Sequence, residues 1–227
     1  MKNLPLLAFF TIALLHLFGL TVGNNTLVIS TKPLLMPLLG VWLIATASLR
    51  KEQSFLRNTV LGALVFSTLG DVLLMFSEAL YFLLGLGSFL LAHVFYITAF
   101  SSISDFKNGF LSKNYGWAIP FLAFPALLLI FLWEGIPADM KLPVAAYAGV
   151  ISLMALSVLN LKGKIADSTF WTLLAGAVLF LISDSLIAIG KFGQPFEGVR
   201  LAVMGTYIGG QFLLVWGVGE VLKKTDQ

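Results

Sequence analysis

Long apolar runs dominate the chain, and short polar stretches separate them. Eight of these runs are each long enough for a membrane-spanning helix, which needs about 20 mostly apolar residues. The runs lie near residues 4–22, 33–48, 57–76, 79–102, 117–134, 141–161, 168–190 and 199–222. The connecting segments are short, so no run is set apart from the others. The pattern predicts an all-α membrane protein, an eight-transmembrane-helix bundle that forms one domain over residues 1–227.

Composition agrees with this pattern and narrows the chemistry. Hydrophobic residues make up 59% of the chain and charged residues 11%, whereas soluble domains carry about 25% charged residues. The chain has no cysteine and two histidines, His16 and His93. This composition therefore excludes disulfides, thiolate metal sites, cysteine nucleophiles and a histidine-rich metal site. We expect the chemistry to depend mainly on carboxylates and hydroxyls.

The basic residues are distributed unequally across the predicted membrane. With eight spans, both termini and the loops at 49–57, 103–116 and 162–167 share one side, which holds ten of the fourteen lysines and arginines. These ten are Lys2, Arg50, Lys51, Arg57, Lys107, Lys113, Lys162, Lys164, Lys223 and Lys224. The positive-inside rule places this side, with both termini, in the cytoplasm, and the compact loops favour a bacterial inner membrane. The scattered basic residues are not typical of a surface that binds nucleic acid.

The two halves of the sequence resemble each other. A lysine shortly before a proline begins the second and the sixth predicted helix, at Lys32 and Lys141. The third and seventh helices carry an aspartate, Asp71 and Asp184. Four spans in each half would make the repeats parallel, related by an axis along the membrane normal. The predicted repeats are residues 1–113 and 114–227.

Asp71 and Asp184 are the only acidic residues well inside a predicted span. An ionisable residue there costs on the order of 2.5–3.5 kcal/mol and by default marks a functional site. Burial favours the neutral carboxyl group, and a nearby carboxylate disfavours a second ionisation, so we expect one protonated acid and one ionised base. Such a pair is typical of general acid–base catalysis. Alternatively, each aspartate is neutral and hydrogen-bonds a neighbouring helix to stabilise packing.

Further polar residues share helix faces with small residues in the fourth and eighth spans. His93 and Tyr96 lie on one stripe, and Tyr207 and Gln211 lie on another. Small residues beside polar ones suit close helix packing around a narrow cavity. A single histidine in an apolar helix is also compatible with a purely structural hydrogen bond, and we assign that role to His16.

Three lysines on the less basic side are candidates for binding an anionic head group. Lys191 lies two turns after Asp184 on the same helix face, where it can meet a phosphate or stabilise the carboxylate. Lys32 and Lys141 lie at predicted helix starts, close to the membrane surface. All three could instead be interface anchors whose ammonium groups reach the water.

Five segments, taken together and in order, carry a family resemblance. They are Lys32-Pro33 with "LLMP", "FSTLGDVLLM", "GLGSFLLAHVFY", "LISDSLIAI" and "GTYIGGQFLL". In this combination the chain resembles the lysoplasmalogenase family of YhhN-like membrane proteins along its whole length. One departure is the Gly209-Gly210 pair before Gln211, where the family pattern has an alanine next to the glutamine.

The resemblance implies an eight-helix enzyme that hydrolyses the vinyl ether bond of lysoplasmalogens. Its substrates would be lysoplasmenylethanolamine or lysoplasmenylcholine, and its products a fatty aldehyde and glycerophosphoethanolamine or glycerophosphocholine. It also implies that Asp71 and Asp184 are the catalytic pair. Protonation of the outer alkene carbon and addition of water need an acid and a base, with no metal or organic cofactor. We expect this lysophospholipid among the membrane lipids, bound by Lys32, His93, Tyr96, Lys141, Lys191, Tyr207 and Gln211.

A proton-coupled transporter of a small solute or lipid is the competing function. Parallel repeats and paired membrane carboxylates also suit a carrier that uses the aspartates as a proton relay. A carrier predicts substrate accumulation in proteoliposomes without product, whereas an enzyme predicts aldehyde release in detergent. A third interpretation, a structural protein, predicts that alanine at either aspartate prevents folding.

Overall fold

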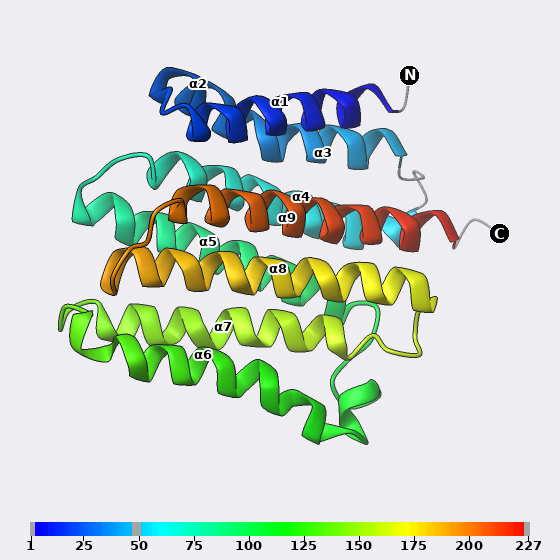
Figure 1. Cartoon of the computed structure of the whole chain (residues 1–227). Helices are drawn as coiled ribbons and strands as arrows, with labels where there is room; N and C mark the ends of the chain where they lie inside the picture. Colours follow the sequence, from blue (N-terminus) through cyan, green and yellow to red (C-terminus); the bar gives the residue numbers. More distant parts are fainter. Residues whose placement is uncertain (1–2, 47–50, 225–227) are drawn as a thin grey trace.

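The computed structural model describes residues 3–46 and 51–224, without the side chains of 51, 52 and 224. Within these ranges the regular elements are all helices, and eight helical segments are long and apolar enough to cross a membrane. The chain is therefore an all-α, multi-pass membrane protein, as predicted. Helix α1 begins and helix α9 ends at the same end of the bundle (Figure 1). The cytoplasmic location of that end stays a prediction.

The elements follow one another with short connections. The α-helices are α1 (Leu4–Thr21), α2 (Asn25–Thr31), α3 (Leu35–Thr46), α4 (Lys51–Leu73), α5 (Ala79–Ser101), α6 (Ile119–Leu132), α7 (Lys141–Leu159), α8 (Asp167–Phe192) and α9 (Val199–Lys224). Four 3-10 turns join or flank them: η1 (Lys32–Leu34), η2 (Phe110–Ser112), η3 (Tyr115–Ala118) and η4 (Trp133–Gly135).

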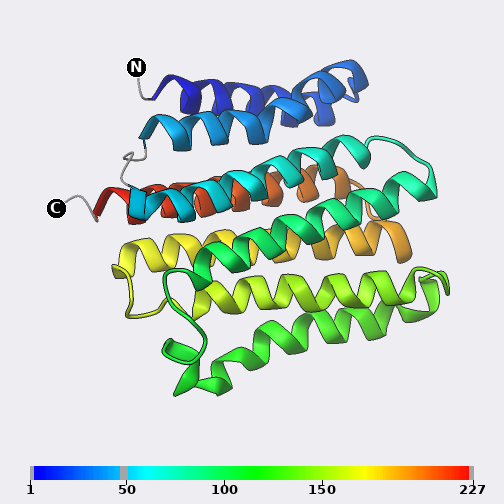
Figure 2. The ribbon, with the colours of Figure 1, turned by 180° about the vertical axis from the view of Figure 1, so that it is seen from behind.

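Four helices form the centre of the bundle. The hairpin of α8 and α9 faces the viewer in Figure 1, and the hairpin of α4 and α5 lies behind it and comes forward in Figure 2. Helices α1 to α3 cover one edge of this centre, and α6 and α7 cover the other. Helix α3 packs on α4 and α9, while α7 packs on α5 and α8. Descent of the two halves from one repeat stays a prediction.

The second span starts earlier than predicted and is interrupted. The structure begins this span at Asn25 and continues it to Thr46, and the side chain of Asn24 accepts a hydrogen bond from a backbone N–H of the first turn. The 3-10 turn η1 joins α2 to α3 and contains Pro33, whose missing N–H suits the start of such a turn. Lys32 therefore lies inside the span, not at its start. The predicted helix end at 47–48 lies outside the described residues.

The loop predicted at 49–57 is wrong from residue 51 onward. Helix α4 begins at Lys51, so the polar residues that suggested a loop form the first turns of a helix. A membrane helix can carry polar residues at its end because that end extends beyond the hydrocarbon core. Residues 2, 49 and 50 lie outside the described ranges.

Glycines allow α8 and α9 to approach closely. A Cβ atom added at Gly210 would lie 2.9 Å from the backbone nitrogen of Phe180 and 3.0 Å from the carbonyl oxygen of Gly176. Both obstacles are backbone atoms, which cannot move aside as a flexible side chain can. Small residues at such crossings let membrane helices pack through their backbones.

Replacement of Gly210 by alanine should therefore separate α8 from α9. We expect a loss of about 1–3 kcal/mol of stability, the usual range for overpacking, seen as a lower melting temperature in detergent. Gly205→Ala on the same helix is the control, because nothing lies within 4 Å of its Cβ position. Equal melting temperatures for the two variants would contradict the close backbone contact.

Candidate active site

Asp71 lies in a buried cluster built by three spans. Its side chain is 3% exposed, and Lys32 Nζ from η1 lies 3.4 Å from Oδ1. The hydroxyl of Tyr207 on α9 donates a hydrogen bond of 2.7 Å to Oδ2. Both carboxylate oxygens of Asp71 thus have partners. The structure brings together three residues that the sequence analysis selected separately.

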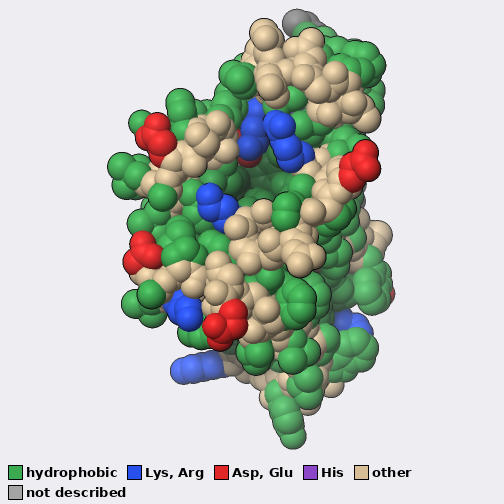
Figure 3. All heavy atoms as spheres, turned by 60° about the vertical axis from the view of Figure 1, so that its left-hand side comes forward, with side chains coloured by type: hydrophobic (Ala, Val, Ile, Leu, Met, Phe, Trp, Pro, Cys, Tyr) green, Lys and Arg blue, Asp and Glu red, His purple; other side chains and the backbone are tan. Residues whose placement is uncertain are grey.

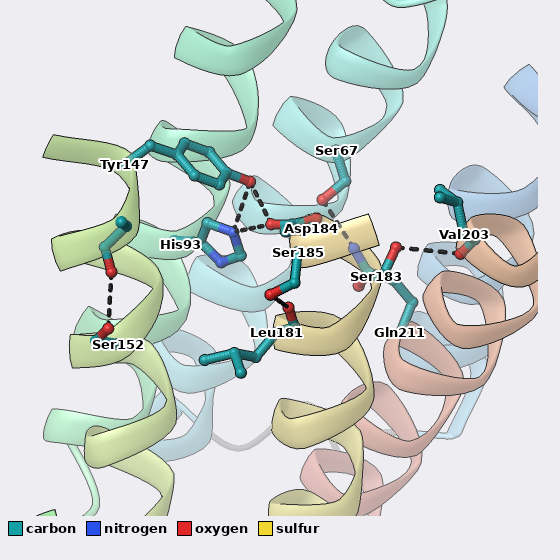
Figure 4. Close-up of polar contacts among 11 residues, drawn as sticks. Ser67, His93, Tyr147, Ser152, Leu181, Ser183, Asp184, Ser185, Val203 and Gln211 are labelled. Atoms are coloured by element: carbon teal, nitrogen blue, oxygen red, sulfur yellow. Dashed lines mark hydrogen bonds and ion pairs between the residues drawn. The ribbon is translucent and has the colours of Figure 1, made fainter. Parts of the chain in front are cut away.

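Asp184 lies in a second cluster, where α5, α7 and α8 meet (Figure 4). Its side chain is 7% exposed, and His93 Nε2 lies 3.1 Å from Oδ2. Tyr147 of α7 donates a hydrogen bond to the same oxygen, and its hydroxyl lies 3.0 Å from His93 Nε2. In the folded bundle His93 of α5 thus reaches Asp184 of α8, a contact between two of the residues that the sequence analysis selected.

Tyr96 and Gln211 form a third set of buried contacts. The hydroxyl of Tyr96 donates to Gln211 Oε1 at 2.6 Å, and Gln211 Nε2 donates to the hydroxyl of Ser67 at 3.0 Å (Figure 4). All three side chains are fully buried, and Ser67 lies one helical turn before Asp71. These hydrogen bonds tie α4, α5 and α9 together beside the carboxylates.

Aromatic rings pack between the two aspartate clusters. The ring centroid of Phe180 lies 4.7 Å from that of His93 and 5.5 Å from that of Tyr207. Phe89 contacts Tyr207 at 5.8 Å and Phe180 at 6.5 Å. His93 contacts Asp184, and Tyr207 contacts Asp71. The ring of Phe180, which lies against both His93 and Tyr207, therefore links the two aspartate clusters.

A large cavity opens at the end of the bundle opposite the first residue of α1. Its volume is about 700 Å³, and basic side chains border a hollow on this face (Figure 3). Lys32, Lys191 and Arg200 line the cavity, together with mostly apolar residues of α1, α2, α5, α8 and α9. Lys141 does not line it, because its ammonium group lies over the Trp133 ring, 4.8 Å from the centroid. We call this hollow the mouth cavity.

Two smaller apolar cavities lie farther inside the bundle, and the carboxyl group of Asp184 lines both of them. The first has a volume of about 40 Å³ and shares Leu74, Phe82 and Ile187 with the wall of the mouth cavity. The second has about 60 Å³, and the two share Asp184 and Tyr147 as lining residues. Asp184 therefore lines two small apolar cavities, one of which shares wall residues with the mouth cavity.

The sequence analysis missed Tyr147 and underestimated Arg200. Tyr147 lies in a predicted span that is otherwise mostly apolar, and its hydroxyl was a signal of the same kind as that of Tyr96. Arg200 entered only the count of basic residues. Its position on the wall of the mouth cavity depends on how α9 packs against α8, which one sequence does not reveal.

The sequence is similar to known proteins over most of its length. A sequence model of the YhhN family matches residues 27–218. The chain is 34% identical to the pig (Sus scrofa) protein named lysoplasmalogenase TMEM86B, over 70% of this chain and 62% of the pig protein. It is 32% identical to the mouse (Mus musculus) TMEM86B protein, over 82% of this chain and 72% of that protein.

A bacterial relative extends the comparison. The protein named lysoplasmalogenase from Mycobacterium tuberculosis is 29% identical over 77% of this chain and 66% of its own length. The matched regions thus span less than two thirds of the pig and mycobacterial proteins. No solved structure matches the chain significantly. Because the family model covers most of the sequence and the mouse relative is matched over most of both chains, this protein belongs to the YhhN family.

Proposed function

We propose that the protein hydrolyses the vinyl ether bond of lysoplasmalogens, with lysoplasmenylethanolamine or lysoplasmenylcholine as substrate. One observation carries the proposal: the buried carboxyl group of Asp184 lines small apolar cavities, one of which shares wall residues with a basic mouth cavity. Several relatives are named lysoplasmalogenase, which favours this reaction over other uses of a buried carboxyl group. The products are a fatty aldehyde and the corresponding glycerophospho compound.

The shape and polarity of these spaces fit a lipid with one chain. A lysophospholipid carries a phosphate at one end and a single apolar chain at the other. Lys32 and Lys191 at the mouth suit the phosphate, and the apolar walls farther inside suit the chain. The vinyl ether, which joins the chain to the glycerol, then lies between these regions, next to the aspartates. Lys141, over Trp133 and outside the cavity, has no part in this arrangement.

In this mechanism Asp184 donates the proton. Its carboxyl group lines two small apolar cavities, and its oxygen Oδ2 already accepts a hydrogen bond from Tyr147. The other oxygen, Oδ1, is therefore assigned to carry the proton toward the cavity. Transfer of this proton to the outer alkene carbon converts the vinyl ether into an oxocarbenium ion, the slow step of the reaction.

Asp71 serves as the ionised partner. The ammonium group of Lys32 lies 3.4 Å from Oδ1 of Asp71 and is placed to pair with the carboxylate form. This carboxylate stabilises the cation and accepts a proton from the water that adds to the carbon bearing oxygen. The resulting hemiacetal separates into aldehyde and glycerol hydroxyl, with no net gain or loss of protons. Return of the proton from Asp71 to Asp184 completes the cycle, so water is the only co-substrate.

The protein also has a proposed membrane location and orientation. We place the protein in a bacterial inner membrane, with both termini in the cytoplasm and the mouth cavity on the opposite side. This orientation follows from the excess of lysine and arginine in the segments at the end where the termini lie.

Asparagine at either aspartate should prevent hydrolysis. We expect the wild-type protein in detergent to release fatty aldehyde from lysoplasmenylethanolamine. Asp71→Asn or Asp184→Asn should lower turnover by about 10²- to 10⁴-fold, because this is the usual contribution of a general acid or base. Asp167→Asn, at the exposed start of α8, is the matched control and should keep full activity. Near-normal turnover in either test variant would refute the acid–base assignment. Absence of aldehyde from folded wild type, with accumulation in proteoliposomes, would favour the carrier.

Hydrolysis in D₂O tests the position of proton transfer. Since the acid delivers its proton to carbon, the aldehyde should carry one deuterium on the carbon next to the carbonyl, and turnover should be slower than in H₂O. Mass spectrometry of the product measures the deuterium. The control is unlabelled aldehyde incubated in D₂O with the Asp184→Asn variant. Product without deuterium would mean that another bond is attacked.

A double-mutant cycle tests whether Asp71 is ionised. Lys32→Met keeps a similar side-chain volume but leaves the buried carboxylate of Asp71 without its cation. The free energy of unfolding should therefore fall by about 3 kcal/mol. This value is the lower end of the range for a buried ion pair, because Lys32 is partly exposed. The double variant Lys32→Met with Asp71→Asn should recover most of this loss. Unfolding in detergent at neutral pH provides the measurement. An unchanged stability of Lys32→Met would indicate a neutral Asp71 and reverse the two roles.

A further inference from the structure

The wall of the mouth cavity includes a histidine that the proposed reaction does not use. His16 on α1 is fully buried and lines the cavity together with Lys32, Lys191 and Arg200. Its sequence context suggested only a structural role. Its hydrogen bonds in the folded protein indicate a second one.

Among the described residues, one of the two ring nitrogens of His16 has a hydrogen-bond partner. Nδ1 lies 2.9 Å from the hydroxyl oxygen of Thr31. That hydroxyl donates its hydrogen to the carbonyl oxygen of Leu27 at 2.6 Å, so toward His16 the oxygen accepts and Nδ1 donates. In a neutral imidazole Nε2 then carries the lone pair. Nε2 is buried and has no hydrogen-bond partner among the described residues, and an unpaired buried polar atom is costly unless a ligand satisfies it.

The charges around the mouth cavity select for an anion. Lys32 comes from η1, Lys191 from the end of α8 and Arg200 from the start of α9, and no carboxylate belongs to the described residues that line the space. Three cations around one cavity raise its positive potential and attract negative charge. The guanidinium of Arg200 can hold the two free oxygens of a phosphodiester at once. The ammonium groups of Lys191 and of Lys32, which also pairs with Asp71, can donate further hydrogen bonds.

We propose that the mouth cavity is the head-group site, where Lys32, Lys191 and Arg200 bind the phosphodiester and His16 Nε2 accepts a hydrogen bond from the same lipid. This inference rests on the proposed function. The donor to His16 is an N–H or O–H group, either the ethanolamine ammonium or the free glycerol hydroxyl. Three glycerol carbons separate the phosphate from the vinyl ether oxygen, and Lys32 contacts both this cavity and Asp71. A phosphate held at Lys32 therefore holds the vinyl ether close to the aspartates.

Kinetics with and without a head group test the basic residues. We expect Arg200→Gln to raise KM for lysoplasmenylethanolamine about tenfold, the effect of one lost charged hydrogen bond, with little change in kcat. KM for a 1-alkenylglycerol, which lacks phosphate, should not change. The control is Lys164→Gln, an exposed lysine between α7 and α8, which should behave as wild type with both lipids. An unchanged KM for the phospholipid in Arg200→Gln would overturn the site.

The choice of head group tests His16. His16→Leu should raise KM several-fold, and lysoplasmenylcholine, whose quaternary nitrogen has no N–H, identifies the donor. An effect on the ethanolamine lipid alone indicates the ammonium, and an effect on both lipids indicates the glycerol hydroxyl. Melting temperatures near that of wild type show that the variant is folded. No effect on either lipid refutes the assignment of His16.

A binding measurement separates this inference from the proposed reaction. A lysophosphatidylethanolamine with a saturated ether chain cannot be hydrolysed, and it should raise the melting temperature of wild type more than that of Arg200→Gln. The matching alkylglycerol should have the same effect on both proteins. If this pattern holds while wild type releases no aldehyde, the head-group site stands and the proposed reaction is wrong. If aldehyde is released and the lipid protects both proteins equally, only the head-group site is wrong.

Discussion

The need to bury two carboxyl groups in an apolar bundle explains much of this structure. Each carboxyl group is stabilised only if other spans supply partners. Asp71 has Lys32 and Tyr207, and Asp184 has His93 and Tyr147. These partners come from helices far apart in the sequence, so the polar contacts tie both halves of the chain into one centre.

The two aspartates differ because their surroundings differ. A cation lies beside Asp71, whereas Asp184 adjoins apolar cavities and accepts hydrogen bonds through one oxygen. Under the proposed mechanism this difference separates base from acid, although the residue type is the same. The interruption of the second span matters here, because η1 places Lys32 inside the bundle and next to Asp71.

The spans themselves could be predicted because each depends on a local property, a run of apolar residues long enough to cross the bilayer. Their ends were harder to predict. Lys32-Pro33 suggested a helix start but lies inside the second span, at its interruption. The polar residues after position 50 suggested a loop but begin α4. Polar and proline residues weaken a hydropathy signal without necessarily ending a helix, since packing and tight turns compensate for them.

The sequence by itself determined the eight spans, the two intramembrane aspartates and the lysines beside the less basic surface. The tertiary structure alone decided which side chains meet: Tyr147 with Asp184, Arg200 with the mouth cavity, and His16 with Thr31. The reason is physical. Hydropathy depends on residues adjacent in sequence, whereas the rotation of each helix about its axis depends on packing against neighbours, including the close contact of Gly176 and Gly210. That rotation decides which polar groups face one another.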